Sequence, residues 1–523
     1  MTMATTTYPL HRAMLINRRG IACHLDDRTI SWGELGDRVA RIAGALQHLS
    51  IAPGDRVGVL MLNQHRYFEI YFALAWIGAV IVPLNTRWAL EENAFAVRDS
   101  GMKALFAERA FLTQGQSLAA SSANLTLLYA DDQPASEGVL DYEQLIASTE
   151  PVEDVNAPSQ SLCGIFYTGG TTGQPKGVML SHGNLMANAR NFTCEGYSAR
   201  GLYLHAAPMF HLANAGAMYA AMLGGARHAF LKQFSPAGLA EVIAQHRVTD
   251  TLLVPTMLQM LIDQPGLESI DLSSLTRILY GASPISEAVL DRAIAALPHT
   301  EFIQAYGMTE MSAAITLLPW PDHLGAAREV GLHRSAGRPI HFVDVRIVDE
   351  QRNPLPPCMV GEIIARGETL MQGYWHRPEE TAAAIIDGWM HTGDGGYMTE
   401  DGYVFVVDRI KDMIITGGEN VYSAEVENIL ARHPAVAQCA VIGLPDAKWG
   451  ETVHAVIMQK PGSTVSADAL IAFCRTQLAA YECPRSATIG DAPLPLSGAG
   501  KILKRTLRDT LIQKGHDNAS SAL

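Results

Sequence analysis

Short apolar runs alternate with amphipathic stretches of helical length along the first three-quarters of this chain. The segment 67–77, which separates the first two runs, is typical of a buried helix. Because strands that alternate with helices favour mostly parallel, doubly wound sheets, we expect an α/β fold. Apart from 126–130, residues 107–160 are rich in Ala and Ser and predict no element. The runs predicted as strands are 56–62, 79–84, 126–130, 163–168, 201–208, 228–231, 250–255, 276–282 and 300–306.

The pattern changes in the last third of the chain. Residues 340–408 hold short strands separated by turns such as Glu400-Asp401-Gly402, which predicts a small antiparallel β module. We place a hinge near 409–412 and expect a large domain over 1–409 and a small, mobile α+β domain over 410–523. The elements expected in the small domain are a helix with Ser423 as N-cap and Glu425 in its first turn, strands over 437–444 and 454–460, and a helix over 466–480.

Composition agrees with two domains and restricts the partners. A chain of 523 residues is longer than one hydrophobic core usually serves. The net charge of −14 argues against bulk nucleic-acid binding. The seven cysteines show no CxxC pair and no metal-ligand spacing, so we expect free, mostly buried thiols in a reducing compartment.

The sequence contains no clear targeting or membrane segment. Its start lacks the apolar core of a signal peptide. The longest apolar run, 70–84, is too short to span a bilayer, and Gly78 divides it into a helix and a strand. The C-terminal Ser-Ala-Leu matches a peroxisomal address only in part, because Ala522 stands where a basic residue is expected. We therefore predict a cytoplasmic protein.

One loop has the composition of a phosphate-binding site. FYTGGTTGQPKGVML (166–180) lacks the second glycine and the hydroxyl of a Walker A loop, and strands flank it on both sides. Glycines permit close backbone approach, while hydroxyls and a lysine attract anions. A flexible turn is the alternative. The residues that would contact phosphate are Thr168, Gly169, Gly170, Thr171, Thr172, Gly173 and Lys176.

This loop resembles the signature of the adenylate-forming (AMP-binding) superfamily, which includes acyl- and aryl-CoA synthetases. The signature reads Tyr-Thr-Ser-Gly-Thr-Thr-Gly-x-Pro-Lys-Gly, and Gly169 replaces its serine. Further segments match in the family's order. QAYGMTE (304–310) implies that Tyr306 stacks on adenine beside Gly307, that Thr309 contacts the α-phosphate, and that Glu310 holds Mg2+. YGASP (280–284) implies a second adenine wall of Gly281, Ala282 and Ser283.

The C-terminal motifs complete the resemblance. Within HTGDGGYMTEDGYVFVVDRIKD (391–412), Asp394 and Arg409 would bind the ribose side and Lys411 would be the hinge. TGGENVYSAEVE (416–427) implies that Gly417, Gly418 and Glu419 line the CoA path. In SGAGKILKRTLR (497–508), Lys501 is implied as the catalytic lysine. Lys504, Arg505 and Arg508 share its helical spacing and are expected to form a solvated basic face.

The resemblance implies a ligase that uses ATP, Mg2+ and coenzyme A. The substrate carboxylate attacks the α-phosphate of ATP, which releases pyrophosphate, and CoA then displaces AMP. The family's small domain reorients between the two steps, which exchanges Lys501 for the loop at 416–422.

The acid would bind at PMFHLANAG (208–216), with His211 near its carboxylate. This wall is small and apolar and contains no lysine or arginine, so dicarboxylates and amino acids are not expected. A medium or long fatty acid is favoured, and hydroxycinnamate- or benzoate-type acids are the alternative. The residues implied for the pocket are His211, Leu212, Ala213, Ala215, Thr256, Gly281 and Met308.

The acceptor is open to other interpretations. AAYECPRS (479–486) has Glu482 where CoA ligases often carry a lysine, and Arg485 could compensate. An enzyme that loads a separate carrier protein and a catalytically silent nucleotide- or acyl-binding protein are the alternatives. We expect a small-molecule acid, ATP and CoA as partners, with no nucleic acid and no integral membrane span; a homodimer is compatible with the sequence.

Overall fold

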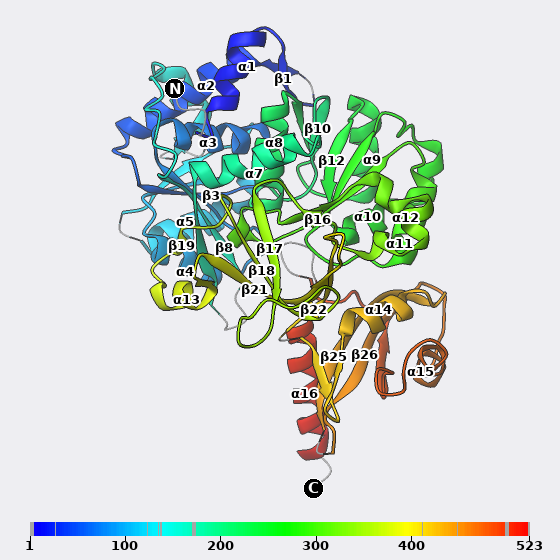
Figure 1. Cartoon of the computed structure of the whole chain (residues 1–523). Helices are drawn as coiled ribbons and strands as arrows, with labels where there is room; N and C mark the ends of the chain where they lie inside the picture. The colour runs from blue at the N-terminus through cyan, green and yellow to red at the C-terminus, as the bar shows by residue number, and fades with distance from the viewer. Residues whose placement is uncertain are drawn as a thin grey trace.

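The computed structural model describes most of the chain, in the ranges 5–26, 28–122, 124–133, 135, 139–169, 174–410, 412–446, 448–496 and 502–520. Six of the predicted site residues lie outside these ranges: Gly170, Thr171, Thr172, Gly173, Lys411 and Lys501. The described chain forms a large α/β body with a smaller unit below it, which holds the C-terminal helix (Figure 1).

The first main sheet has nine strands. Its central strands run parallel and its edge strands are antiparallel, as the alternation of strands and helices predicts. The carboxyl ends of the parallel strands therefore meet along one edge. In spatial order the strands are β16 (Arg338–Pro339), β15 (Thr316–Leu318), β14 (Glu301–Tyr306), β13 (Arg277–Gly281), β12 (Asp250–Leu253), β10 (Leu202–His205), β11 (Arg227–Phe230), β1 (Ile21–His24) and β2 (Thr29–Ser31).

The second main sheet has eight strands, and its glycine-rich loop joins two antiparallel neighbours, in which Thr168 pairs with Lys176. The prediction of a strand–loop–strand turn is confirmed. In spatial order the strands are β19 (Gly373–Tyr374), β9 (Lys176–Ser181), β8 (Leu162–Thr168), β4 (Val80–Pro83), β3 (Arg56–Leu60), β5 (Ala104–Ala107), β6 (Thr126–Tyr129) and β7 (Leu140–Asp141).

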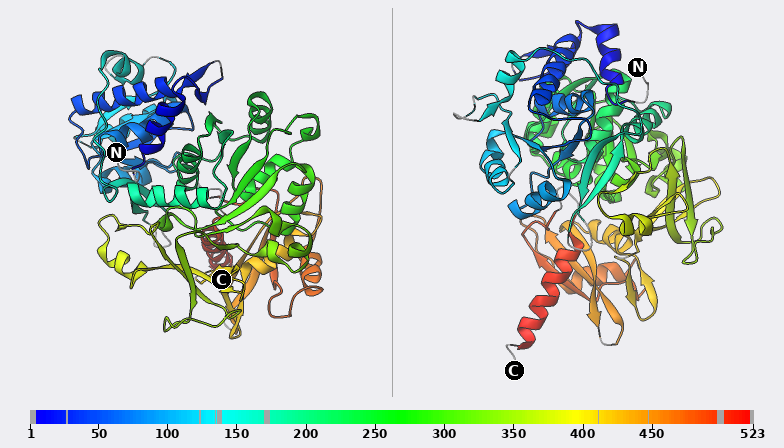
Figure 2. Two further views of the ribbon diagram at one scale, coloured as in Figure 1. Left: turned by 45° about the horizontal axis from the view of Figure 1, so that its top comes forward. Right: turned by 90° about the vertical axis from the view of Figure 1, so that its left-hand side faces the viewer.

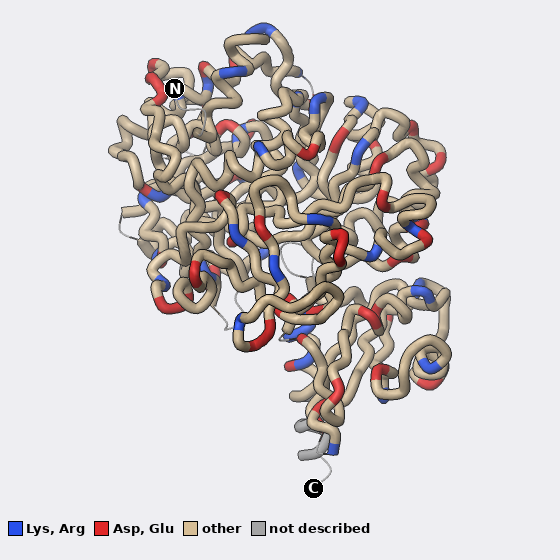
Figure 3. The backbone as a smooth tube through the Cα atoms, viewed as in Figure 1, with Lys and Arg blue, Asp and Glu red and all other residues tan. Residues whose placement is uncertain are grey.

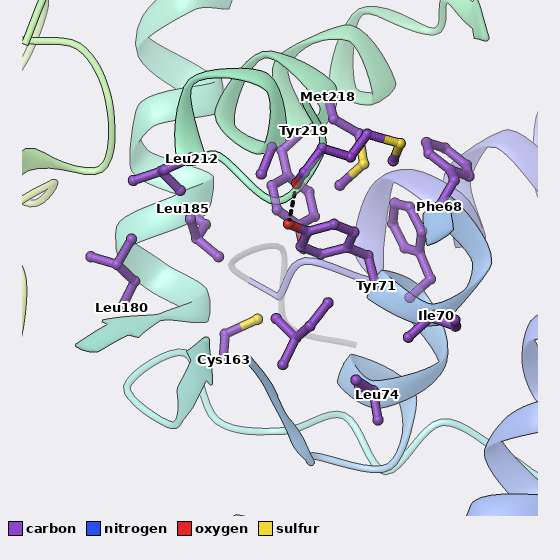
Figure 4. Packing of buried hydrophobic residues seen from close by; sticks show 14 of the residues in the cluster. Phe68, Ile70, Tyr71, Leu74, Cys163, Leu180, Leu185, Leu212, Met218 and Tyr219 are labelled. Atoms are coloured by element: carbon purple, nitrogen blue, oxygen red, sulfur yellow. Dashed lines mark hydrogen bonds between the residues drawn. The ribbon is translucent and has the colours of Figure 1, made fainter. Parts of the chain in front are cut away.

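Helices cover both sheets, and the largest core cluster includes many residues of α2 (Trp32–His48), α3 (His65–Trp76), α7 (His182–Cys194) and α8 (Leu212–Gly224). Figure 4 shows Tyr71 of α3 against Tyr219 of α8, with the Tyr71 hydroxyl donating to the Met209 carbonyl at 2.8 Å. The helices on the outer faces are α9 (Pro236–His246), α10 (Pro255–Ile262) and α11 (Glu287–Ala296) on the first sheet and α4 (Leu90–Ser100) and α5 (Leu112–Ala120) on the second.

Residues 107–160 are more regular than the sequence predicts, since they contain α5, β7 and α6 (Tyr142–Ser148). These elements are short and rich in small residues, so their periodicity is weak. Gly78, at φ +68°, separates α3 from β4 as predicted. The remaining helices of the large body are α1 (Tyr8–Asn17), α12 (Gly325–Glu329) and α13 (Pro378–Ala384).

The predicted antiparallel module is confirmed as a five-stranded sheet. It lies at the lower edge of the large body, next to the C-terminal unit (Figure 1). Asp394 on one strand is directly opposite Arg409 on its neighbour. The strands are β17 (Val343–Val348), β18 (Gly361–Gly367), β21 (Trp389–Met398), β20 (Ile385–Ile386) and β22 (Val404–Arg409).

The C-terminal unit has cores of its own, which contain only residues between 414 and 511. The right-hand view of Figure 2 shows it projecting below the large body. Its helix predicted over 466–480 ends at Arg475, because the chain turns where the Glu482 carboxylate accepts from the Ala479 amide at 2.9 Å. The elements are β23 (Ile414–Thr416), β24 (Glu419–Val421), α14 (Ser423–Ala431), β25 (Val436–Asp446), β26 (Gly450–Gln459), α15 (Ala467–Arg475), β27 (Ser486–Gly490) and α16 (Lys504–Ser520).

Two predictions about this unit are wrong for electrostatic reasons. Ser423 is not the N-cap of α14, since that position is Tyr422; its amide and hydroxyl instead donate to the buried Asp408 carboxylate. The basic face of α16 is not generally solvated. Lys504 pairs with Glu427 at 2.8 Å and Arg508 pairs with Glu451 at 2.7 Å, so buried or half-buried carboxylates draw both cations inward.

Surface charge and thiols agree with the sequence analysis. Figure 3 shows acidic and basic residues interspersed over the body and the C-terminal unit. All seven cysteines are free, four of them buried. Among the described residues no helix is both long enough and apolar enough to cross a bilayer.

Candidate active site

The predicted ribose and adenine residues come together at the edge where β14 ends. The Tyr306 hydroxyl, at the last residue of β14, donates to Asp394 Oδ2 at 2.8 Å. The Arg409 guanidinium lies 3.5 Å from Asp394 Oδ1. Burial and the negative charge of Asp394 raise the pKa of Tyr306, so its hydroxyl remains a donor. The three side chains form one cluster, with an aromatic ring, a carboxylate and a cation side by side.

The residue implied to hold Mg2+ lies beside the flank of the glycine-rich loop. Glu310 is in a short 3-10 helix (Thr309–Met311) that begins with Thr309, and it is only 8% exposed. The Tyr374 hydroxyl donates to Glu310 Oε1 at 2.8 Å, and Lys176 Nζ lies 5.0 Å from the centre of the Tyr374 ring. A nearly buried carboxylate beside a phosphate-type loop fits Mg2+, which is usually held by one or two carboxylates together with substrate phosphates.

Backbone strain collects around the same edge. Ala282, Ser312 and Ala313 all have positive φ, which is uncommon for residues with a side chain. A Cβ on Gly307 would approach the Ala313 carbonyl oxygen to 1.9 Å, so this turn requires glycine. These residues fix the loop that follows β14.

Gly281 has a packing role in the first sheet. A Cβ there would lie 2.0 Å from the Ala305 carbonyl oxygen, so the glycine permits β13 to approach β14. The two residues pair in the sheet, which brings the YGASP segment, with Ala282 and Ser283, beside the end of β14. Its contact with adenine stays a prediction.

The acid segment begins at the N-terminus of α8. His211 is the N-cap of this helix, and its Nδ1 accepts from the Ala213 amide at 3.3 Å. An accepting Nδ1 carries no proton, so the imidazole is neutral with its proton on Nε2. Leu212 and Ala215 are buried in the main core, while Ala213, Thr256 and Met308 are partly exposed.

A clamp fixes the loop that leads to His211. Asn63 Nδ2 donates to the carbonyls of His205 and Ala207, each at 2.9 Å, and its Oδ1 accepts from the Met209 amide at 2.8 Å. Three of the four hydrogen-bonding sites of the Asn63 side-chain amide are therefore occupied, and Asn63 is only 5% exposed. The position of His211 therefore depends on a residue from the other sheet.

Alternate residues of β13, from Gly281 back to Arg277, form a column beneath α8. Because side chains alternate along a strand, Arg277, Leu279 and Gly281 share one face of β13. On α8, Ala213, Ala217 and Ala221 are four residues apart and also share a face. Leu279 is partly exposed although β13 has neighbours on both sides, and Ala213 is partly exposed above it.

A cavity lies at the far end of this column. It encloses about 30 Å3 between α8 and the sheet. The hydrophobic cluster on this face joins Ala213, Ala217 and Ala221 to Tyr203, Leu252 and Leu279. We call the space between the alanine face of α8 and the column on β13 the acid slot. The cavity is lined by Phe192, Tyr197, Ala199, Tyr203, Ala217, Ala220, Ala221, Asp250, Thr251, Arg277 and Leu279.

Comparisons with known proteins agree with this arrangement. The family model for AMP-binding enzymes matches residues 5–375, and that for the AMP-binding enzyme C-terminal domain matches residues 425–501. The chain belongs to the AMP-binding enzymes. It is 39% identical over 508 residues to a feruloyl-CoA synthase from an Amycolatopsis species, covering 96% of this chain and 98% of that one.

Two further AMP-binding enzymes show the range of relatives. A fatty acid–[acyl-carrier-protein] ligase, ScoC of Streptomyces coeruleorubidus, is 36% identical over 489 residues, covering 92% of each chain. The crystal structure of ATP-bound MatB from Rhodopseudomonas palustris superposes with a TM-score of 0.87 at 28% identity, covering 97% of this chain and 98% of that one. The protein is thus an enzyme, an acid–thiol ligase of the adenylate-forming type, and this class uses ATP, Mg2+ and CoA.

The residues implied for the CoA path gather around one tryptophan. The Gly417 amide donates to the Trp449 carbonyl at 2.8 Å, and the Arg485 guanidinium lies 4.3 Å from the centre of the Trp449 ring. Gly417 and Gly418 both have positive φ, and Glu419 is exposed beside them. Glu482 caps the Ala479 turn, so it has a local structural role whatever it does toward CoA.

Part of the machinery lies at or beyond the limits of the described chain. Thr168 and Gly169 lead into the glycine-rich loop, and a Cβ on Gly169 would contact none of the described residues within 4 Å. Lys501, Lys411 and the loop residues 170–173 lie outside the described residues. Their roles stay predictions.

Sequence reasoning missed several residues that the structure places at the site. Tyr374 and Trp449 are aromatic residues outside the motifs that were read, and their proximity to Glu310 and Arg485 follows only from the fold. Asn63 follows a predicted strand directly, which is a usable signal for a polar residue at a sheet edge. Asp250 and Arg277 stand at strand starts, and the sequence carries no signal for their meeting.

Proposed function

We propose that this protein is an ATP-dependent CoA ligase for aryl acids of the hydroxycinnamate type. The observation that carries the proposal is the cavity of the acid slot, which is lined by apolar residues of α8 and β13 and by the polar residues Asp250 and Arg277. The similarity to feruloyl-CoA synthase supports the same class of acid.

The dimensions of the slot favour a rigid, medium-length acid. From Gly281 to Arg277 the strand rises about 13 Å, at roughly 3.3 Å per residue. From Ala213 to Ala221 the helix rises about 12 Å, at 1.5 Å per residue. The β13 and α8 walls of the slot therefore have nearly equal length, which suits an aromatic ring on a short unsaturated chain. Beyond them the Asp250–Arg277 pair would meet the apolar tail of a long fatty acid, an unfavourable contact.

In the first step the residues at the strand ends would bind and orient the reactants. Tyr306 would stack on adenine, while Asp394 and Arg409 would bind the ribose. Lys176 and the loop at 168–176 would hold the β- and γ-phosphates. Neutral His211, with its proton on Nε2, would donate to the acid and aim its carboxylate at the α-phosphate. Thr309 would contact the α-phosphate, Glu310 would hold Mg2+, which neutralises phosphate charge, and Lys501 would stabilise the charge that develops.

In the second step the C-terminal unit would bring the CoA path to the acid. We propose that residues 1–409 and 410–523 are domains that reorient about Lys411. Gly417, Gly418 and Glu419 would then line the pantetheine path, with Arg485 near the phosphates of CoA. Asp408 and Ser423, which bond across the two units, would have to adjust in that motion.

A medium-chain fatty acid is the second candidate for the substrate. The apolar lining of the slot and the similarity to a fatty acid ligase support it, and the sequence alone favoured this class. Transfer to a separate carrier protein is the matching alternative for the acceptor. Magnesium use, the cytoplasm as the location and a homodimer stay predictions.

Product analysis on a panel of acids tests the proposal. Ferulate, 4-hydroxycinnamate, benzoate, octanoate and dodecanoate are each incubated with ATP, Mg2+ and CoA, and AMP and thioester are measured by chromatography and mass spectrometry. We expect the highest kcat/KM for the two hydroxycinnamates and no thioester without CoA. Higher values for dodecanoate would reject the aryl proposal, and pyrophosphate release without any thioester would reject CoA as the acceptor.

A further inference from the structure

We propose that the Asp250–Arg277 pair is a recognition site for a hydroxyl group at the distal end of the acid. The proposal rests on the proposed function and extends it, because it names the group of the substrate that the far end of the acid slot would bind. Both residues line the cavity there, together with Ala217, Ala221 and Leu279.

The pair is set into the sheet rather than placed on the open surface. Asp250 and Arg277 are the first residues of β12 and β13 and pair directly in the parallel register. Asp250 is only 7% exposed, and its Oδ2 accepts from the Thr249 hydroxyl at 2.6 Å. Burial raises the pKa of Asp250. A carboxylate in this position gains from any further hydrogen-bond donor that enters the cavity.

Arg277 has spare hydrogen-bonding capacity. Its guanidinium contacts Asp250 at 3.5 Å and Glu301 at 3.7 Å, both long for a hydrogen bond. Its Nε is buried and has no hydrogen-bond partner among the described residues. Tyr197 covers the guanidinium, with its ring centre 5.8 Å away. A buried donor without a partner is costly, so an oxygen atom in the cavity would be bound favourably.

The chemistry of the pair selects a hydroxyl. A phenol or alcohol can donate to the Asp250 carboxylate and accept from Arg277, whereas a methoxy oxygen can only accept. A second carboxylate on the acid would be repelled by Asp250 and Glu301. The cavity of about 30 Å3 is larger than the roughly 10–15 Å3 that one water molecule needs, and so it admits a hydroxyl group.

Selectivity for the hydroxyl is the measurement that tests the proposal. kcat/KM is determined for 4-hydroxycinnamate, 4-methoxycinnamate and cinnamate, and for 8-hydroxyoctanoate and octanoate. Wild-type enzyme should prefer each hydroxylated acid over its parent by about 10- to 100-fold, because the parent leaves buried polar groups unpaired. In the neutral double variant Asp250→Asn/Arg277→Gln that preference should fall to about 3-fold or less, with KM for ATP unchanged.

A matched control removes a similar pair away from the cavity. Arg247 and Asp271 are 3.4 Å apart and exposed, so Arg247→Gln/Asp271→Asn should keep the wild-type preference. The proposal is overturned if wild-type enzyme prefers neither hydroxylated acid, or if the cavity variant retains the preference. If that variant does not fold, the wild-type series decides, with the methoxy acid expected nearer to cinnamate than to the hydroxy acid.

The same data separate this proposal from the proposed function. Turnover of octanoates without turnover of cinnamates rejects the aryl acid as substrate. The preference for 8-hydroxyoctanoate over octanoate still tests the Asp250–Arg277 pair in that case.

Discussion

The two ends of the active site are built in different ways. The nucleotide end takes Tyr306, Asp394 and Tyr374 from three sheets and Glu310 from a 3-10 helix, and side-chain hydrogen bonds join Tyr306 to Asp394 and Tyr374 to Glu310. The acid end is one face of α8 laid over one column of β13, with apolar contacts along its length and a polar pair at its far end.

This difference predicts different consequences for substitutions at the two ends. At the nucleotide end each residue has a polar partner, so a substitution breaks a hydrogen bond and affects every substrate equally. At the acid end a substitution changes a volume or one terminal contact, and so it alters the choice of acid. The following experiments test that division.

The largest effect is expected for Lys501→Ala. If Lys501 stabilises charge in the first step, adenylation should slow by about 100- to 1000-fold for every acid, since loss of one preorganised donor typically costs that much. Reaction of preformed acyl adenylate with CoA should be spared. Both half-reactions are followed by quenched-flow, with the exposed Lys460→Ala as the control. Equal loss of the two half-reactions would show that Lys501 serves both steps or the fold.

A smaller effect is expected for Tyr306→Phe. The substitution removes the hydroxyl that donates to Asp394, so KM for ATP should rise about 10-fold while the ranking of acids stays the same. Tyr403→Phe is a matched control, because Tyr403 donates to Asp322 at the same distance of 2.8 Å away from the nucleotide cluster. A changed ranking of acids in Tyr306→Phe would contradict the separation of the two ends.

The opposite pattern is expected for Ala217→Leu in the acid slot. The larger side chain should lower kcat/KM for ferulate about 10-fold and leave a short acid such as butanoate unaffected, since pocket volume typically discriminates by about 1–3 kcal/mol. KM for ATP and the melting temperature are measured alongside. An equal loss for ferulate and butanoate would place Ala217 outside the slot.

The smallest effect is expected for Glu482→Lys. Restoring the basic residue that CoA ligases often carry should lower KM for CoA about 2- to 5-fold, as exposed charge pairs usually contribute little. The parameters for ATP and acid should not change. The exposed Glu268→Lys serves as the charge-matched control. A higher KM for CoA would indicate that the Glu482–Ala479 cap matters more than the charge.

The fold and the nucleotide end could be predicted because their signals are local. Buried runs such as 163–168 became strands, and Tyr306 stands at the end of β14, where parallel sheets collect functional residues. Asp394 lies within β21 and Arg409 ends β22, in the antiparallel module that the sequence also predicts. Ser423 shows the limit of local reasoning. Its N-cap signal was overridden by Asp408, a carboxylate distant in sequence.

The acid end could not be predicted because its residues carry no local signal. Leu279 and Ala217 look like ordinary core residues, and only the fold shows that both line one cavity. The meeting of Asp250 with Arg277 depends on the register of β12 against β13, which strand patterns alone do not fix. For the same reason the sequence alone favoured a fatty acid.

A crystal structure with a non-hydrolysable feruloyl-adenylate analogue would test the central claim most directly. We predict that the ring lies between Ala217 and Leu279 and that its hydroxyl is within hydrogen-bond distance, about 3 Å, of Asp250 and Arg277. An aromatic ring outside the space between α8 and β13, with Asp250 and Arg277 unchanged and without contact to the ligand, would contradict the account.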